Sequence, residues 1–223
     1  MNTLKGILFD LDGTLIDTAP DFVSTLNTLL ARHNKPSVDA DSIRQTVSHG
    51  ARALVTLGFG INPEDEGFEE LRLELLDIYE GCLADSTRLF PGMEEVLDHI
   101  ESLKLSWGIV TNKPSLYTDK ILSALNLSTR AMAAVCPDHV RHTKPHPEPM
   151  YLACDIINCH PTQALYVGDH KRDIDAGRNA GMPTVAARYG YVDKPEQIEL
   201  WRADYIIEQP GDLINLINEI RNR

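Results

Sequence analysis

Short apolar runs alternate with helical patterns over most of the chain, and this alternation limits the possible folds more than any other feature. Apolar runs bounded by turn residues are typical of buried strands, and helices between such strands are typical of parallel βαβ units. The pattern predicts an α/β fold with a doubly wound, Rossmann-like parallel sheet. We expect strands at 5–9, 105–111, 131–136, 164–168, 184–187 and 205–207, and helices at 93–103, 115–125, 147–158, 173–180 and the C-terminus.

The stretch after the first predicted strand departs from this alternation. Apolar residues recur at helical spacing from Phe22 to Leu30, and further helical patterns follow at 43–47, 52–57 and 68–83. No strand signal interrupts them. We therefore predict two domains, an α/β core formed by residues 1–16 and 88–223, and an all-helical cap domain formed by residues 17–87.

Composition and charge exclude several classes of protein. Of the 223 residues, 43% are hydrophobic and 24% are charged, which is typical of a globular protein. The formal net charge of -12 argues against binding to nucleic acid or to an anionic membrane surface, because the mean field repels phosphate groups. No apolar run approaches the roughly 18 residues that span a bilayer. We expect a cytoplasmic protein.

The cysteines and histidines allow one metal-site hypothesis. The chain has only four cysteines, too few for the disulfide-rich pattern of small secreted proteins, and this is typical of a reducing compartment. They are Cys82, Cys136, Cys154 and Cys159. Zinc donors gather in one stretch, at Cys136, His139, His142 and His146. Prolines at 137, 145 and 147 break any helix that would align them, and no paired-Cys spacing occurs. We predict a surface loop there.

Polar residues follow the predicted strands at their carboxyl ends, where open α/β sheets bind ligands. These residues carry carboxylates, a hydroxyl, an amide and ammonium groups: Asp10, Asp12, Thr111, Asn112, Lys113, Lys144 and Asp169. Three acids at one edge would repel one another unless a cation lay among them. Oxygen ligands of this kind favour Mg²⁺, with water and a substrate phosphate completing its coordination.

An Asp-x-Asp pair alone is weak evidence, because Asp is also common in turns at strand ends. Here Asp10 and Asp12 occur together with a threonine, a lysine and a Gly-Asp pair. Each of these lies at a predicted strand end or helix start. The coincidence favours a catalytic site over a set of turn residues.

Four motifs, in order along the chain, resemble those of the haloacid dehalogenase-like hydrolase superfamily. They are Asp10-Leu-Asp-Gly-Thr-Leu-Ile-Asp17, Val110-Thr-Asn112, Lys144-Pro-His-Pro-Glu-Pro149 and Gly168-Asp-His-Lys-Arg-Asp173. The helical stretch after the first motif is similar to the type-1 cap of the phosphoglycolate phosphatase-like branch. The resemblance covers essentially the whole chain. It implies a phosphoric monoester hydrolase that requires Mg²⁺ and forms an aspartyl phosphate.

The same resemblance implies roles for the three acids at the sheet edge. Asp10 is expected to be the nucleophile and Asp12 the general acid and base. Mg²⁺ is expected to bind Asp10, the backbone carbonyl of Asp12, and Asp169. The ion would neutralise the nucleophile and the phosphate as they meet.

The remaining motif residues are expected to surround the phosphate. Thr111, Asn112 and Lys144 would bind the substrate, and Lys144 would also offset the charge of Asp10. Asp173 would orient Lys144 or a metal-bound water, or serve only as a charge at a helix N-terminus. Position 170 departs from the family pattern, because many relatives carry a small or acidic residue there. We expect His170 to point to solvent.

The cap is expected to select the substrate. Arg52, in the segment Ser48-His-Gly-Ala-Arg52, could pair with a substrate carboxylate, and it equally fits an exposed helix charge. A carboxylate suits phosphoglycolate, and it also suits N-acetylmuramic acid 6-phosphate of cell-wall recycling, which carries a lactyl group. Four stretches resemble phosphatases of that sugar: Asp17-Thr-Ala-Pro-Asp-Phe22, Gly50-Ala-Arg-Ala53, Cys136-Pro-Asp-His-Val140 and Arg188-Tyr-Gly-Tyr191.

Other functions fit the residues less well. A phosphomutase of the same branch usually lacks the Gly-Asp-x-x-x-Asp form of the fourth motif, and a dehalogenase needs no Mg²⁺. A phosphoacceptor signalling domain carries its accepting Asp after a later strand and has no helical cap of this length. We expect the partner to be a small phosphorylated metabolite, with no nucleic acid and no membrane, and the protein to be a monomer or a weak dimer.

Overall fold

The computed structural model describes residues 4–222, and the chain divides into two compact units. The first unit combines the chain up to Ile16 with the chain from Leu89 onward, and the second is Asp17–Arg88. The second unit is therefore an insertion in the first. In the part of the chain that the structure describes, no helix is long and apolar enough to cross a membrane.

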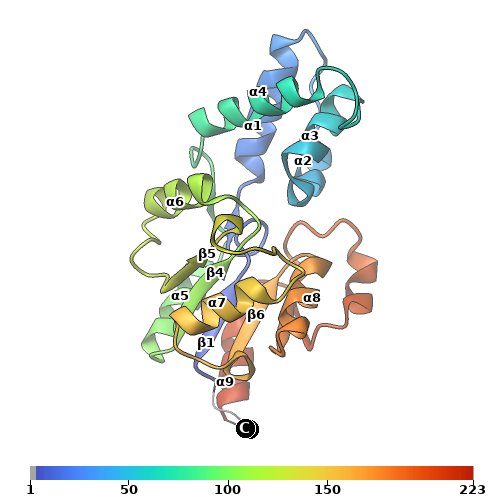
Figure 1. Cartoon of the computed structure of the whole chain (residues 1–223). Coiled ribbons are helices and arrows are strands. Elements are labelled where there is room, and N and C mark those ends of the chain that lie inside the picture. Colours follow the sequence, from blue (N-terminus) through green and yellow to red (C-terminus); the bar gives the residue numbers. More distant parts are fainter. Residues whose placement is uncertain (1–3, 223) are drawn as a thin grey trace. The chain divides into compact units, whose positions relative to one another are not determined.

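A six-stranded parallel sheet forms the centre of the first unit (Figure 1). The strand order is β5-β4-β1-β6-β7-β8, and every neighbouring pair is parallel. The order reverses beside β1, and such a switch point is where open α/β sheets bind ligands. The strands are β1 (Gly6–Phe9), β4 (Ser106–Val110), β5 (Ala133–Val135), β6 (Ala164–Gly168), β7 (Thr184–Ala187) and β8 (Tyr205–Ile207).

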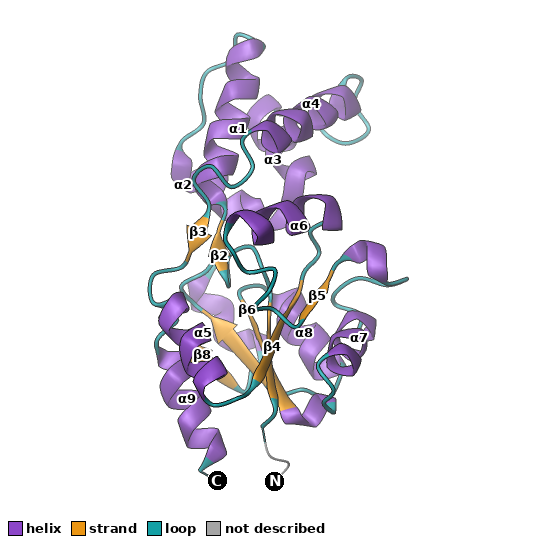
Figure 2. Ribbon diagram, turned by 90° about the vertical axis from the view of Figure 1, so that its left-hand side faces the viewer, coloured by secondary structure: helices purple, strands orange, loops and turns teal. Residues whose placement is uncertain are grey.

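The central strands form because they are apolar on both faces. All residues of β1, β6 and β7 are buried, which is the pattern of strands covered by helices on each side. Helices α5 and α9 lie on one side of the sheet and α7 and α8 on the other (Figure 2). The structure confirms the predicted α/β fold. The helices are α5 (Met93–Ser102), α6 (Ser115–Ala124), α7 (Glu148–Ile156), α8 (Lys171–Asn179) and α9 (Asp212–Arg221).

The inserted unit consists of helices that pack around an apolar core. Phe22 of α1 stacks on Tyr79 of α4, with ring centroids 4.2 Å apart. The helical patterns of the sequence correspond to these elements, although their ends shift by a few residues because capping rather than periodicity sets them. The elements are α1 (Ala19–Arg32), α2 (Ala40–Thr46), the short 3₁₀ helix Val47–His49, α3 (Gly50–Phe59) and α4 (Phe68–Gly81).

A buried carboxylate joins the beginning of the inserted unit to its end. The side chain of Asp21 accepts hydrogen bonds from the backbone N–H of Ser86 at 2.7 Å and of Thr87 at 3.2 Å, and from the Thr87 hydroxyl at 2.6 Å. These three donors replace the water that a carboxylate loses on burial.

A small second sheet was not expected from the sequence. It consists of β2 (Ile16–Asp17) and β3 (Arg88–Leu89), which contain the two points where the chain passes between units. Strands of two residues are too short to show alternation, so the sequence carries no signal for them. Short 3₁₀ helices also occur at Pro137–His139, Pro161–Gln163 and Pro195–Trp201.

Candidate active site

The candidate site lies at the carboxyl ends of three neighbouring strands. Phe9, the last residue of β1, is in register with Ile109 of β4 on one side and with Val167 of β6 on the other. The residue that follows each strand therefore reaches the same edge. In this way the sheet brings together residues that are far apart in the sequence: Asp10, Thr111 and Asp169.

The loop after β1 is held close to the end of β6. The backbone N–H of Asp10 donates to the carbonyl of Val167 at 2.8 Å, and the N–H of Leu11 donates to the Asp10 carboxylate at 2.7 Å. Gly13 has a φ of 85°, and a Cβ there would lie 2.2 Å from a carboxylate oxygen of Asp169. Only glycine allows this approach, because it has no side chain and tolerates positive φ.

Asp169 is buried and has partners on both carboxylate oxygens. The hydroxyl of Thr14 donates to one oxygen at 3.0 Å, and the backbone N–H of Tyr191 donates to the other at 2.8 Å. Gly190 precedes Tyr191, and a Cβ at that position would lie 2.2 Å from the carbonyl oxygen of Gly13. Two glycine loops therefore pack directly around this carboxylate.

Lys144 lies at the centre of the site, and its side chain is 1% exposed. Its ammonium is 2.8 Å from Asp10, 2.7 Å from Asp173, and 2.9 Å from both the Tyr166 hydroxyl and the carbonyl of Val110. Both carboxylates thus share one cation. Asp173 thus contacts the Lys144 ammonium, and it also caps helix α8 by accepting from the N–H of His170.

Asn112 contacts the backbone of Lys144 with both ends of its amide. Its Nδ2 donates to the Lys144 carbonyl at 3.1 Å, and its Oδ1 accepts from the Lys144 N–H at 3.2 Å. We expected Asn112 to bind substrate, and in the structure its amide also holds the backbone of Lys144. Thr111 is buried beside it, and its hydroxyl accepts from the N–H of Lys113 at 3.1 Å.

Burial and mutual repulsion perturb the acids of this cluster. Burial, and then the charge of Asp173, raise the pKa of Asp10 to about 6. Burial and the charge of Asp10 likewise raise the pKa of Asp169 well above its usual value. Burial opposes the charged form of Lys144, yet Asp10 and Asp173 together raise its pKa. Asp10, Asp169 and Asp173 together carry more negative charge than the single ammonium of Lys144 can balance, and that ammonium already pairs with Asp10 and Asp173.

These acids have the chemistry and spacing of a cation site. Asp10, Asp169 and Asp173 each offer one carboxylate oxygen, and these oxygens all lie within 4.8 Å of one another. Carboxylates are the donors that hard divalent cations prefer. A bound cation would also offset the burial and the mutual repulsion that raise the pKa of Asp10 and Asp169. The group could therefore hold a metal ion.

Lys113 is a site residue to which the sequence analysis assigned no role. Its ammonium donates to Asp12 at 2.9 Å, and the two side chains are only 8% and 18% exposed. The sequence did indicate that Lys113 could lie at the site, because it directly follows Thr111 and Asn112 at the end of β4. The contact itself joins residues 101 positions apart, so no local pattern could reveal it.

The sequence analysis also singled out Arg52 and His170. Arg52 is exposed on α3 in the inserted unit, where Arg72 first, and Arg52 to a smaller extent, lower the pKa of Glu69. His170 does not simply point to solvent as we expected, because it caps α8. Its Nδ1 accepts from the N–H of Arg172 at 3.1 Å, and its ring stacks on Trp201.

The stretch with zinc-type donors, which we predicted to be a surface loop, is exposed at 141–143 and 145–146. Cys136 is buried, and its backbone N–H donates to Nδ1 of His139, which closes the 3₁₀ turn at that point. Among residues 4–222, the nearby group of metal-ligand type contains His142 and His146 with Glu148, and it does not include Cys136.

Comparisons with known proteins show which family this chain resembles. A family model described as haloacid dehalogenase-like hydrolase matches residues 7–187. An N-acetylmuramic acid 6-phosphate phosphatase of Pseudomonas putida is 46% identical over 215 residues, 96% of each chain. A phosphoglycolate phosphatase of Xanthomonas campestris is 40% identical over 209 residues, 94% of each chain. A Haemophilus somnus structure, described as a predicted phosphoglycolate phosphatase, superimposes with a TM-score of 0.85 at 27% identity and covers 97% of this chain and 99% of its own.

Proposed function

This chain belongs to the haloacid dehalogenase-like hydrolase family, and we propose that it hydrolyses a small phosphorylated metabolite through an aspartyl phosphate on Asp10. The family and the relatives named as phosphatases identify it as a phosphoric monoester hydrolase. The observation that supports the proposed chemistry best is the Asp10–Lys144–Asp173 cluster, in which one buried ammonium faces the proposed nucleophile at 2.8 Å.

Asp10 is the proposed nucleophile. Its carboxylate would attack phosphorus in line with the leaving oxygen and divide a difficult hydrolysis into two easier steps. Lys144 keeps a positive charge beside Asp10, which favours the ionised carboxylate and offsets the approach of an anionic phosphate. Thr111, at the adjacent strand end, is placed to donate its hydroxyl to a phosphate oxygen.

Asp12 is the proposed general acid and base. It would protonate the leaving alkoxide in the first step and deprotonate the attacking water in the second. Lys113 holds its carboxylate at 2.9 Å, so this side chain has a defined orientation at the site. Asn112 contributes by positioning the backbone of Lys144.

Mg²⁺ is the proposed cofactor. Asp10, Asp169 and the backbone carbonyl of Asp12 would hold it, and Asp173 would support the site through Lys144. The ion would supply charge neutralisation for the nucleophile and the phosphate. Both carboxylates with raised pKa values belong to this donor set, which supports the assignment.

We propose that the substrate carries a carboxylate in addition to its phosphate monoester. N-acetylmuramic acid 6-phosphate is the first candidate, because relatives 46% and 43% identical are named as its phosphatases. Phosphoglycolate is the second, supported by the relatives 40% identical that are named for it. In both molecules a carboxylate offers a partner for an arginine such as Arg52.

Phosphate release from matched substrates tests this function. N-acetylmuramic acid 6-phosphate is compared with N-acetylglucosamine 6-phosphate, which lacks the lactyl carboxylate, and phosphoglycolate with ethyl phosphate. We expect the carboxylated member of one pair to have a kcat/KM at least about tenfold higher. Equal values within both pairs would contradict a carboxylate-specific enzyme.

The same assay tests the cofactor. EDTA should abolish activity and Mg²⁺ should restore it. Ca²⁺ should inhibit, because its larger and looser coordination misplaces the phosphate. Undiminished turnover in excess chelator would contradict the Mg²⁺ proposal without affecting the substrate assignment.

A further inference from the structure

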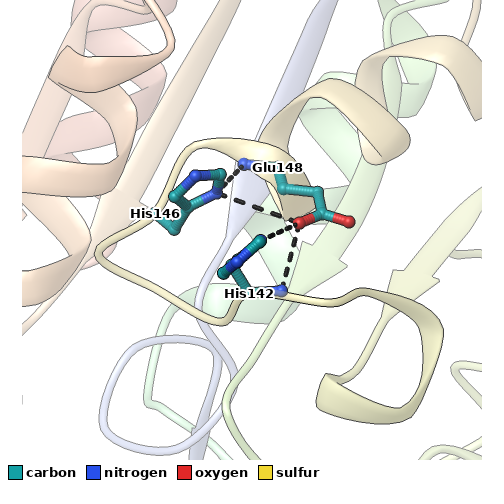
Figure 3. A group of neighbouring side chains, drawn as sticks. All are labelled: His142, His146 and Glu148. Carbon is teal, nitrogen blue, oxygen red and sulfur yellow. Dashed lines mark hydrogen bonds and ion pairs between the residues drawn. The ribbon is translucent and has the colours of Figure 1, made fainter.

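A second cluster of metal-ligand side chains lies outside the acidic site, between the 3₁₀ turn Pro137–His139 and helix α7. Figure 3 shows the rings of His142 and His146 next to each other, both near the Glu148 carboxylate. Nδ1 of His142 is 2.8 Å from Oε2 of Glu148, and Nδ1 of His146 is 3.9 Å from the same oxygen. One ligand atom from each residue lies within 4.8 Å of the other two.

The carboxylate of this cluster is held in place by the backbone. The N–H of Arg141 donates to Oε1 of Glu148, and the N–H of His142 donates to Oε2, both at 3.0 Å. The Arg141 N–H, followed by the His142 side chain, lowers the pKa of Glu148. An ionised and oriented carboxylate therefore faces two imidazoles.

The two imidazoles are accessible and already close to each other. Their ring centroids are 4.5 Å apart, and their side chains are 62% and 49% exposed. Nδ1 of His146 accepts a hydrogen bond from the backbone N–H of Glu148 at 3.2 Å. Neutral imidazole is the form that binds metals.

We propose that His142, His146 and Glu148 form a second metal site, which binds a zinc-like transition-metal ion rather than Mg²⁺. Two imidazole nitrogens and one carboxylate suit Zn²⁺, Ni²⁺ or Cu²⁺, whereas Mg²⁺ prefers oxygen donors. The ion would replace the proton between His142 and Glu148, and water would complete its coordination. The site is chemically distinct from the all-carboxylate cluster of Asp10, Asp169 and Asp173.

The proposed metal site lies in the same chain segment as Lys144 of the candidate active site. Lys144 lies midway between His142 and His146 in the sequence, two residues from each. An ion bound by both histidines would link the two flanks of the segment that carries Lys144. Asn112 already holds the backbone of Lys144 in that segment. A bound ion would thus add a second restraint to the same loop.

Calorimetric titration of the purified full chain with Zn²⁺, in excess Mg²⁺ to occupy the acidic site, tests the proposal. We expect about one equivalent of Zn²⁺ to bind the wild type, and affinity to fall at least about tenfold in the variant His142→Ala/His146→Ala. His33→Ala is the matched control, because His33 forms an exposed pair with Glu74 at the same 2.8 Å but, among residues 4–222, belongs to no group of three metal-ligand side chains. This control should bind like the wild type.

Two further measurements keep the result decisive. Asp169→Asn should retain Zn²⁺ binding, because Asp169 belongs to the other cluster. X-ray absorption of the zinc-loaded wild type, which needs no variant, should show two imidazole ligands. An all-oxygen shell, loss of binding in Asp169→Asn, or unchanged binding in the double variant would each overturn the second site, and none of these results would bear on phosphatase activity.

Discussion

At the scale of single residues, charge balance around one lysine organises the site. Lys144 is buried with two carboxylates within 2.8 Å, so removing the lysine would leave both carboxylates without the cation they share. Asp12 is paired separately with Lys113. The two acids of the first motif therefore have different electrostatic partners, and substitutions at each should have different effects.

Asparagine substitutions at the first-motif acids should separate the two roles. Asp10→Asn removes the attacking charge at nearly constant volume, so we expect a loss of at least about a thousandfold, or about 4 kcal/mol in barrier. Asp12→Asn should impair alkyl phosphates much more than p-nitrophenyl phosphate, whose leaving group needs little protonation. A burst followed by slow turnover should mark accumulated phosphoenzyme. If Asp12→Asn loses both substrates equally without a burst, Asp12 is not the acid and base.

Lys113→Met tests whether Lys113 positions Asp12. Loss of a largely buried, charge-assisted hydrogen bond should lower kcat on alkyl phosphates about tenfold, and lower it less on p-nitrophenyl phosphate. Lys113→Arg should recover much of the alkyl rate. Lys171→Met is the control, because it removes an exposed ion pair with Asp175 at the start of α8. A uniform loss on both substrates that Arg does not rescue would indicate a purely structural role.

At the scale of elements, the site depends on how closely two loops approach at the sheet edge. Gly13 follows β1 and Gly190 follows β7, and side chains at either position would collide with Asp169. The strands place the acids at one edge, and these glycines allow the loops to close around them. Loop packing and metal binding should therefore change together.

Gly190→Ala should disturb both the packing of these loops and the binding of Mg²⁺. The added Cβ would lie 2.2 Å from the Gly13 carbonyl and 2.3 Å from Cβ of Asp169, so we expect about 1–3 kcal/mol of destabilisation and a higher Mg²⁺ concentration for half-maximal activity. Gly211→Ala is the control, because nothing lies within 4 Å of its Cβ and its φ is negative. Chemical denaturation and a Mg²⁺ titration of activity measure the two effects, and an unchanged Mg²⁺ requirement would separate this contact from the site.

The strand-end acids should also make stability depend on pH and Mg²⁺ together. Asp10 and Asp169 have raised pKa values, so from about pH 4 upward the metal-free folded state holds protons that the unfolded chain has released. These groups then reduce stability as the pH rises through the pKa of Asp10, about 6. Mg²⁺ must displace the same protons, so it should raise Tm more at about pH 7.5 than at about pH 5. Thermal melts of the wild type and Asp169→Asn measure this, and an equal Mg²⁺ effect at both pH values would contradict it.

At the scale of the whole molecule, the chain separates its general chemistry from its proposed selectivity. The proposed catalytic residues are all in the α/β unit, whereas Arg52 is in the inserted helical unit. An insertion can change without disturbing the sheet that positions the acids. Such a division is expected when one phosphatase core acts on different metabolites.

Arg52→Ala tests this division. The substitution should lower kcat/KM for a carboxylated substrate by about tenfold or more, because a charge-assisted pair is lost. It should have little effect on p-nitrophenyl phosphate, which has no carboxylate. Arg72→Ala is a control in the same unit, since Arg72 pairs with Glu69 on α4. Equal losses on both substrates would show that Arg52 does not select for the carboxylate.

The sequence by itself determined the α/β class and the central strands, because apolar runs and helical spacing are local properties. It also placed Asp10, Thr111 and Asp169 at strand ends, where the geometry of a parallel sheet predicts a site. Only the tertiary structure decided which side chains meet. The contacts of Lys113 with Asp12, of Asn112 with the Lys144 backbone and of Thr14 with Asp169 join distant segments, and no local pattern encodes them. The same holds for the cluster of His142, His146 and Glu148, although these residues are close in sequence. Backbone N–H groups of the folded loop orient the Glu148 carboxylate toward the histidines.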